Sequence, residues 1–394
     1  MQNLYSPHSM QPIHFNNFGI ILFCAFSLLS CSGAQKKPDK TVSIASKQEA
    51  LRSLRSTIKP ATTAVVVSSN EIDWHVGNLP WDRFTLPVIS PDGLHAAVQL
   101  GPAVPSQILS GTDTSSVNHT VIELHHIDPV HGDTMEPIVV KQQGLLLGRN
   151  ANNVALLVQA PRGSAGRWIG RVDWATGQLR WLVSDDSTNA FPALNQRGDL
   201  AWSRQPKGDH RYHLVVKTSN GERTIDDGDS DWLVPSFSDN NTLFVFRLHD
   251  GTLSLVALDL QARDPLLTAA TLTLMQSGAT REQAWQIATT NPANPLGALA
   301  FYHPVHHRMT LWQPGNAMET TYFVQDSVAA APVKDGSWIV TTSDRVIRQQ
   351  LGSNDGIHLR DLLAVPIATT SSQWTHLMLV PDGNRLEVRA INVE

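Results

Sequence analysis

The chain has 394 residues, of which 41% are apolar and 16% charged, so it can bury a sizeable core and is neither a disordered chain nor a coiled coil. Its formal net charge is −5, and its Lys and Arg residues are scattered without a basic run, which argues against nucleic-acid binding. The two cysteines, Cys24 and Cys31, both lie near the N-terminus, so the rest of the chain has no pair that could form an internal disulfide.

The N-terminal segment indicates export. Residues 18–30 read FGIILFCAFSLLS, an apolar run that is too short to span a membrane and is typical of a signal-peptide core. It ends at Leu28-Leu29-Ser30-Cys31, which resembles the bacterial lipoprotein signal. The resemblance implies lipidation at Cys31 and, from Ser32 behind it, the outer membrane. A simple signal peptide or a misassigned start codon stays an alternative, because no Lys or Arg precedes Phe18.

Residues 32–63 are rich in Ser, Lys, Gln and Thr and hold few large apolar side chains, a composition typical of a flexible tether. The predicted organisation is a signal peptide and lipidation site over residues 1–31, a tether over residues 32–63 and a folded domain over residues 64–394. The lipid would attach the folded domain to a membrane.

A reverse turn followed at once by a short apolar strand recurs through the folded domain. It begins with Ser90-Pro91-Asp92-Gly93 before LHAAVQL and ends with Pro381-Asp382-Gly383 before NRLEVRAI. Asp-Gly and Asn-rich pairs accept the positive φ that tight hairpins require. Successive turns are 41 to 60 residues apart, about the length of one four-stranded blade. The landmark residues are Asp92, Asn152, Gly198, Asn240, Asn294, Asp335 and Asp382.

The two longest intervals have visible causes. Residues 101–118 are an insertion of Gly, Pro, Ser and Thr, and residues 279–289 (ATREQAWQIAT) have the spacing of an inserted helix.

The turns also carry a family resemblance. Ser90-Pro91-Asp92-Gly93 and its echo at Pro381-Asp382-Gly383 resemble the repeats of TolB-type propellers, and Asp173-Trp174-Ala175-Thr176-Gly177 is similar to hairpins of quinoprotein-like and WD-repeat blades. The resemblance extends over about residues 61–394. Together with the seven turns, it predicts an all-β fold, a single seven-bladed β-propeller of four-stranded blades.

The ends of the chain are expected to meet. The residues after Asp382 suffice for the second strand of the last blade and no more, whereas residues 64–76 have strand character and precede the first inner strand. We therefore expect the N-terminal strands to pair with the C-terminal blade and close the ring, with Val65 to Val67 beside Leu386 to Ile391. Such closure removes exposed sheet edges.

An acidic run over residues 226–231 is the first candidate site. Asp227, Asp229 and Asp231 have the alternating spacing that begins a calcium loop. The rest of the pattern is missing, because Trp232 stands where a glycine is needed and Ser238 where a bidentate carboxylate belongs. A solvated acidic connector between blades is the favoured interpretation, and calcium at the three aspartates is kept as a candidate. No other cofactor is expected.

Two groups of histidines form a second candidate, because neutral imidazoles bind transition metals when they converge. Neighbours on a strand point to opposite faces, so His125 with His126, and His306 with His307, cannot aim at one ion in a regular strand. Packed or surface histidines are therefore favoured over a metal site. The groups comprise His119, His125, His126 and His131 in one blade and His303, His306 and His307 in another.

The tryptophans are the third candidate, and wedging of blades is favoured over ligand stacking. Several of the 11 recur near blade junctions: Trp168, Trp174, Trp181, Trp202, Trp232, Trp312 and Trp338. Signatures of catalysis are weak, since the string Arg162-Gly163-Ser164-Ala165-Gly166 lacks the first glycine of a nucleophile elbow.

The favoured functional hypothesis is a monomeric, non-catalytic binding or scaffold module that presents loops to a protein or glycan at the cell envelope. The alternative is a carbohydrate-active hydrolase or lyase with paired carboxylates at the channel mouth. Each carboxylate available for that role lies in a reverse turn, where Asp is favoured for structural reasons alone. They are Asp92, Asp199, Asp239, Asp335 and Asp382. The ligand-binding residues stay unknown from the sequence.

Overall fold

The computed structural model describes residues 73–81, 86–101, 120–128, 135–162, 166–238, 241–287, 298–314, 320–350, 356–360, 364–371 and 373–393. The predicted signal peptide with Cys31, the tether and the segment Val65 to Val67 lie outside these residues, as does nearly all of the insertion predicted over residues 101–118. No helix among the described residues is both long and apolar enough to cross a membrane.

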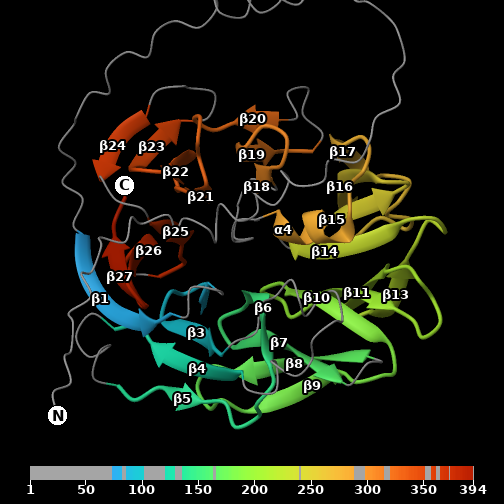
Figure 1. Ribbon diagram of the computed structural model, residues 1–394, viewed down its shortest axis with the longest axis horizontal. Helices are drawn as coiled ribbons and strands as arrows, with labels where there is room; N and C mark the ends of the chain where they lie inside the picture. The colour runs from blue at the N-terminus through green and yellow to red at the C-terminus, as the bar shows by residue number, and fades with distance from the viewer. Residues whose placement is uncertain are drawn as a thin grey trace, which may run out of the picture.

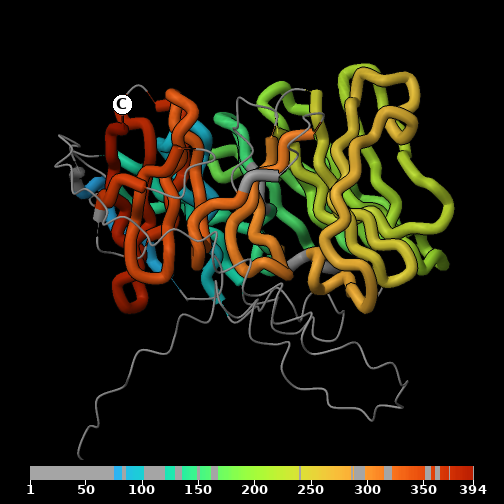
Figure 2. Tube along the Cα trace, turned by 90° about the horizontal axis from the view of Figure 1, so that it is seen from above, coloured from blue at the N-terminus to red at the C-terminus, as the bar shows by residue number. Residues whose placement is uncertain are grey.

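The strands form sheets that stand side by side around a common centre, a propeller-like arrangement (Figure 1). Seen from the side, the strands run up and down between two faces of the molecule (Figure 2). The fold is therefore all-β, as the recurring turns predict. The described residues include one helix, α4 (Arg281–Gln286).

Four separate four-stranded sheets are present among the described residues. They are β2 (Val88–Ile89), β3 (His95–Leu100), β4 (Val121–His126) and β5 (Ile138–Val139); β14 (Asp231–Phe237), β15 (Thr242–His249), β16 (Thr252–Asp259) and β17 (Ala270–Met275); β21 (Ala329–Pro332), β22 (Ser337–Thr341), β23 (Val346–Gln350) and β24 (Gly356–Arg360); and β25 (Val365–Ala368), β26 (His376–Asp382), β27 (Arg385–Ile391) and β1 (Asp73–Pro80).

The other described strands form one sheet of eight and one of three. The larger consists of β6 (Leu146–Ala151), β7 (Ala155–Arg162), β8 (Gly166–Asp173), β9 (Leu179–Val183), β10 (Thr188–Leu194), β11 (Leu200–Gln205), β12 (His213–Thr218) and β13 (Gly221–Ile225), and the smaller of β18 (Leu299–His303), β19 (Arg308–Trp312) and β20 (Thr320–Tyr322).

The prediction of seven separate four-stranded blades is therefore wrong in its count. The eight-stranded sheet is joined at its middle by one parallel residue pair, Thr188 of β10 with Arg167 of β8. The Arg167 N–H donates to the Ser187 carbonyl at 3.3 Å, and Asn189 Nδ2 donates to the Arg167 carbonyl at 3.1 Å. A local side-chain bond thus helps to link two four-stranded units that the repeat predicts to be separate.

The two ends of the described chain share one sheet. β1 pairs antiparallel with β27, from Asp73 opposite Ile391 to Pro80 opposite Arg385. The strand beside β27 therefore overlaps the predicted segment 64–76 at its end and continues beyond it.

The seventh turn is placed wrongly by the repeat. Pro381-Asp382-Gly383 lies between β26 and β27, the second and third strands of their sheet, and not between the first and second. The connection between β25 and β26 contains Thr, Ser and Gln but no Asp-Gly pair, so the sequence gives no turn signal there. Three strands of this sheet consequently come from the C-terminal part of the chain and one from the N-terminal part.

The core lies between neighbouring sheets, so many strands are buried on both faces. β22 is buried at every residue, and one cluster joins Ala201 and Val216 of one unit to Val245 and Val256 of the next. Four tryptophans of the junctions are at most 1% exposed, which confirms the wedging interpretation for them: Trp202, Trp232, Trp312 and Trp338.

The loops between strands define two faces of the molecule. β13 passes to β14 through residues 226–230 at the connector face, and the turn at residues 195–199, between β10 and β11, lies at the opposite turn face. α4 contacts β14, and its neighbouring residue Ile287 is buried in one cluster with Leu233 and Val234. The helix predicted within residues 279–289 is thereby confirmed.

Candidate functional site

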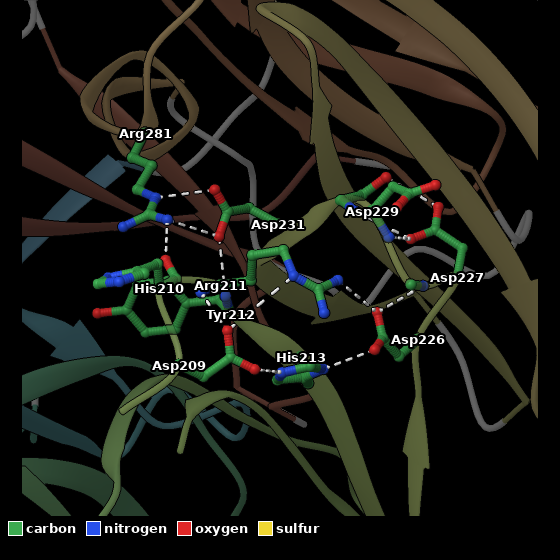
Figure 3. A network of polar contacts seen from close by, with 12 residues as sticks. Asp209, His210, Arg211, Tyr212, His213, Asp226, Asp227, Asp229, Asp231 and Arg281 are labelled. Carbon is green, nitrogen blue, oxygen red and sulfur yellow. Dashed lines mark hydrogen bonds and ion pairs between the residues drawn. The ribbon is translucent and has the colours of Figure 1, made fainter. Parts of the chain in front are cut away.

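Three loops meet at the connector face beside α4 (Figure 3). They are residues 206–212 between β11 and β12, residues 226–230 between β13 and β14, and residues 276–280 before α4. They bring the acidic run predicted from the sequence against several cations. We call the labelled set the acidic network; it comprises Asp209, His210, Arg211, Tyr212, His213, Asp226, Asp227, Asp229, Asp231 and Arg281.

His213, the first residue of β12, lies between two carboxylates. Its Nε2 is 2.8 Å from Asp209 Oδ2, and its Nδ1 is 2.8 Å from Asp226 Oδ2. An ionised carboxylate oxygen only accepts hydrogen bonds, so both contacts are satisfied when both ring nitrogens carry hydrogen. The backbone N–H of Arg211, followed by the His213 side chain, lowers the pKa of Asp209 to about 2. Asp209 is therefore a fixed anion at neutral pH.

Asp227 is held by its own connector and by the next sheet. Its Oδ2 accepts from the Ser230 hydroxyl at 2.8 Å and from Arg247 Nη2 of β15 at 2.7 Å. Arg247 Nε also donates to the Ser230 hydroxyl at 2.9 Å. Burial on its own would raise the pKa of Asp227, but the Ser230 hydroxyl and Arg247 outweigh it and lower the pKa. The pair ties the connector to the second strand of the following unit.

Asp231 ties the loop before β12 to α4. Arg281 donates from Nε to Asp231 Oδ2 at 2.8 Å and from Nη2 to Oδ1 at 2.9 Å, a bidentate pair. The Tyr212 N–H donates to the same carboxylate at 2.8 Å, and Arg281 Nη2 also donates to the His210 carbonyl. The Arg281 guanidinium lies over the Tyr212 ring, 5.4 Å from its centroid. Burial raises the pKa of that tyrosine.

The network is paired within itself. A general acid or base needs an atom that can exchange a proton with a substrate, and a nucleophile needs a base beside it. His213 has both nitrogens occupied, while Asp227 and Asp231 each accept from an arginine. The arrangement braces two sheets and α4 against one another.

The candidate calcium residues do not surround one point. Asp227 turns toward Arg247, Asp231 toward Arg281, and the Asp229 side chain is exposed. Among the described residues, no group of three or more His, Cys, Asp or Glu side chains is placed to hold a metal ion. Asp227 and Asp231 thus act as acceptors for separate arginines in this arrangement.

The turn aspartates serve their own turns. Asp92 Oδ1 accepts from the Ser90 hydroxyl at 2.5 Å, and Asp199 Oδ2 accepts from Asn195 Nδ2 at 2.8 Å. Burial would raise the pKa of Asp335, but Ser337 and Arg348 lower it to about 2. Asp382 is exposed, and Asp239 lies outside the described residues. None of the four described carboxylates is paired with another turn aspartate.

The first predicted histidine group is dispersed, whereas two members of the second lie together. His125 Nε2 contacts Glu123 Oε2 at 3.1 Å, and the ring of its neighbour His126 lies 5.2 Å from that of His95. Two members, His119 and His131, lie outside the described residues. In the other blade His303 and His306 lie in or beside a turn, with ring centroids 4.3 Å apart. Burial lowers the pKa of His303 to about 4.

Sequence reasoning finds the acidic run but misses its cations. Asp231 and Arg281 are 50 positions apart, so no local pattern links them. The pair of Asp227 with Arg247 does have an echo, because Arg204 Nη2 of β11 lies 3.4 Å from Asp185 Oδ2 in the preceding connector. A connector aspartate followed by an arginine in the second strand of the next unit is therefore a repeated feature that the sequence displays.

Comparison with known proteins finds solved structures that share little sequence with this chain. No family model matches the chain, and no curated protein matches it. TolB from Acinetobacter baumannii is 12% identical, covering 76% of this chain and 80% of that protein with a TM-score of 0.35. Prolyl oligopeptidase B from Galerina marginata is 12% identical, covering 75% of this chain and 46% of that one with a TM-score of 0.45.

A puromycin-hydrolyzing peptidase of Mycobacterium tuberculosis is 17% identical, covering 55% of this chain and 33% of the peptidase with a TM-score of 0.36. The chain thus matches less than half the length of either peptidase.

Proposed function

We propose that this chain is a non-catalytic β-propeller lipoprotein that serves as a binding or scaffold module for a protein or glycan at the cell envelope. The observation that supports it is the internal pairing of the acidic network, in which His213 has a carboxylate on each ring nitrogen and Asp231 has a bidentate arginine. The polar groups that come nearest to a catalytic constellation thus stiffen the connector face. A stiff face suits recognition.

The ring belongs to this proposal. The single bridge between β8 and β10 separates two four-stranded units, β6 to β9 and β10 to β13, and β18 to β20 forms a three-stranded unit. The pairing of β1 along β27 supports closure of this ring.

Anchorage is also proposed. Lipidation at Cys31 and a tether over residues 32–63 would hold a monomeric propeller at the outer membrane, with its faces free to bind. Metabolic labelling with an alkyne fatty acid tests this directly. The expected result is label on the wild-type chain and none on Cys31→Ala; equal labelling of both would contradict it.

The binding role is tested with photo-crosslinking residues at two exposed positions. Lys207 lies in a loop of the connector face, and Asn220 lies in the hairpin between β12 and β13, which is at the turn face. The expected result in intact envelopes is a discrete adduct from one position and not the other. No adduct from either position, together with cleavage of envelope glycans by the purified chain that Asp209→Asn abolishes, would overturn the proposal in favour of the hydrolase or lyase.

A further inference from the structure

A second polar site lies at the turn face, in a pair of strands remote from the acidic network. β3 and β4 pair so that His95 stands directly opposite His126. The Ile127 N–H donates to the Leu94 carbonyl at 2.7 Å, which makes Leu94 and Ile127 a hydrogen-bonded pair. The adjacent pair, His95 with His126, is therefore non-hydrogen-bonded, the kind in which opposite side chains are closest. Their ring centroids are 5.2 Å apart.

The nitrogens of these two rings have no partner within the described part of the chain. Within the described part of the chain, no hydrogen bond or ion pair reaches a ring nitrogen of His95 or His126, and Nδ1 of His95 is buried. His213 and His376, by contrast, have both ring nitrogens engaged. A buried polar atom left without a partner is destabilising, so a ligand that fills this position would stabilise the fold.

The surroundings suit a metal ligand. Burial lowers the pKa of His95, an effect that nearby Asp92 partly offsets and His126 reinforces. Neutral imidazole is the form that binds a metal ion. Trp174 stacks on His95, with its ring centroid 5.7 Å from that of His95 and the two planes 22° apart. This contact fixes the orientation of the ring.

We propose that His95 and His126 form a two-histidine site for a divalent late transition-metal ion, with Cu²⁺ bound more tightly than Ni²⁺ or Zn²⁺. When two imidazole nitrogens each lie about 2.0–2.1 Å from an ion and form a tetrahedral angle at it, the two ring centroids are roughly 5 Å apart. The separation of the His95 and His126 ring centroids is close to that distance. Water completes the coordination. The site differs from the histidine groups that the sequence suggests, because its first member comes from β3.

Calorimetric titration of the full chain, without a purification tag that contains histidine, tests the site with CuCl₂, NiCl₂ and ZnCl₂. The expected result is one high-affinity Cu²⁺ per chain, with affinity lowered by at least about tenfold in His95→Gln and in His126→Gln, because each variant removes the second, intramolecular ligand. The matched control is His125→Gln, the next residue of β4, which faces away and contacts Glu123. It should bind Cu²⁺ as the wild type does.

Electron paramagnetic resonance of the Cu²⁺ complex gives an answer that does not depend on how the variants fold. Wild-type chain at one equivalent should show hyperfine coupling to two imidazole nitrogens, and each single variant should show one at most. Binding unchanged in both variants, or coupling to fewer than two imidazole nitrogens in the wild type, would overturn the proposal.

Discussion

Asp231 is the carboxylate of the acidic network that links the loop before β12 to α4. It accepts from Tyr212 N–H and from two nitrogens of Arg281, and its side chain is 12% exposed, against 41% for the arginine. Removing the Asp231 side chain takes the acceptor from both the Tyr212 N–H and the Arg281 guanidinium. Removing Arg281 leaves the Asp231 carboxylate bonded to Tyr212.

We therefore expect Asp231→Ala to lower the free energy of unfolding by about 2–4 kcal/mol and Arg281→Met by about 1 kcal/mol. Urea denaturation followed by tryptophan fluorescence measures both. Arg263→Met, at an exposed arginine, is the control and should change little. Equal losses from Asp231→Ala and Arg281→Met would contradict the asymmetry.

His376 makes folding stability depend on pH. It is 2% exposed, and burial lowers its pKa from 6.5 to about 4, although the Pro332 carbonyl works against this. Between these two pKa values the unfolded chain binds more protons than the folded one, so stability is full above pH 6.5 and falls as pH drops toward 4.

The expected dependence is at most about 1.4 kcal/mol per pH unit from this group. Unfolding free energies measured at pH 7 and pH 5 should differ less in His376→Gln than in the wild type. His75→Gln, at an exposed ring, should keep the wild-type difference. A wild-type pH dependence that survives in His376→Gln would show that another group is responsible.

The hairpin between β15 and β16 shows how a turn positions the network. Asp250 and Gly251 have φ of 46° and 71°, the positive values of a two-residue hairpin turn. A Cβ added at Gly251 would lie 3.1 Å from the Gly278 nitrogen, and the Ala279 N–H donates to the Gly251 carbonyl at 2.9 Å. The turn therefore packs against the segment that leads into α4 and Arg281.

Gly251→Ala should accordingly lower the free energy of unfolding by more than backbone strain alone would. Gly208 is the matched control, because its φ is 86° and a Cβ there would meet nothing within 4 Å. We expect Gly208→Ala to lower the unfolding free energy by about 1–2 kcal/mol and Gly251→Ala by more. Denaturant unfolding of the two variants tests this expectation. A smaller loss of unfolding free energy for Gly251→Ala than for Gly208→Ala would mean that the segment before α4 shifts to accommodate the added Cβ.

What the sequence predicts best are elements marked by local chemistry. β11 and β22 start directly after turns that contain Gly198-Asp199 and Asp335-Gly336, and α4 lies inside the segment with helical spacing. The seventh repeat is misplaced because the Asp-Gly signal marks any tight hairpin, including the one between the second and third strands of the last sheet. Arg281 escapes prediction because the fold, and not chain proximity, sets its contact with Asp231.

The contact of β1 with β27 joins residues more than 300 positions apart, and the proposed closure of the ring depends on it. Val76 and Leu79 of β1 are 2% and 3% exposed and pack with Leu386 and Val388, while Asn78 between them is exposed. Loss of β1 would uncover the edge of β27, a template for pairing with another chain.

A charge on each face of β1 tests this closure. Leu79→Asp replaces a buried leucine and places a carboxylate in an apolar cluster, so we expect a loss of at least about 3 kcal/mol in the free energy of unfolding. Asn78→Asp adds the same charge on the exposed face and should cost less than about 1 kcal/mol. Because the unpaired β27 edge promotes association, sedimentation velocity should detect oligomers in Leu79→Asp alone. Two monomeric variants of equal stability would show that the ring holds together without β1.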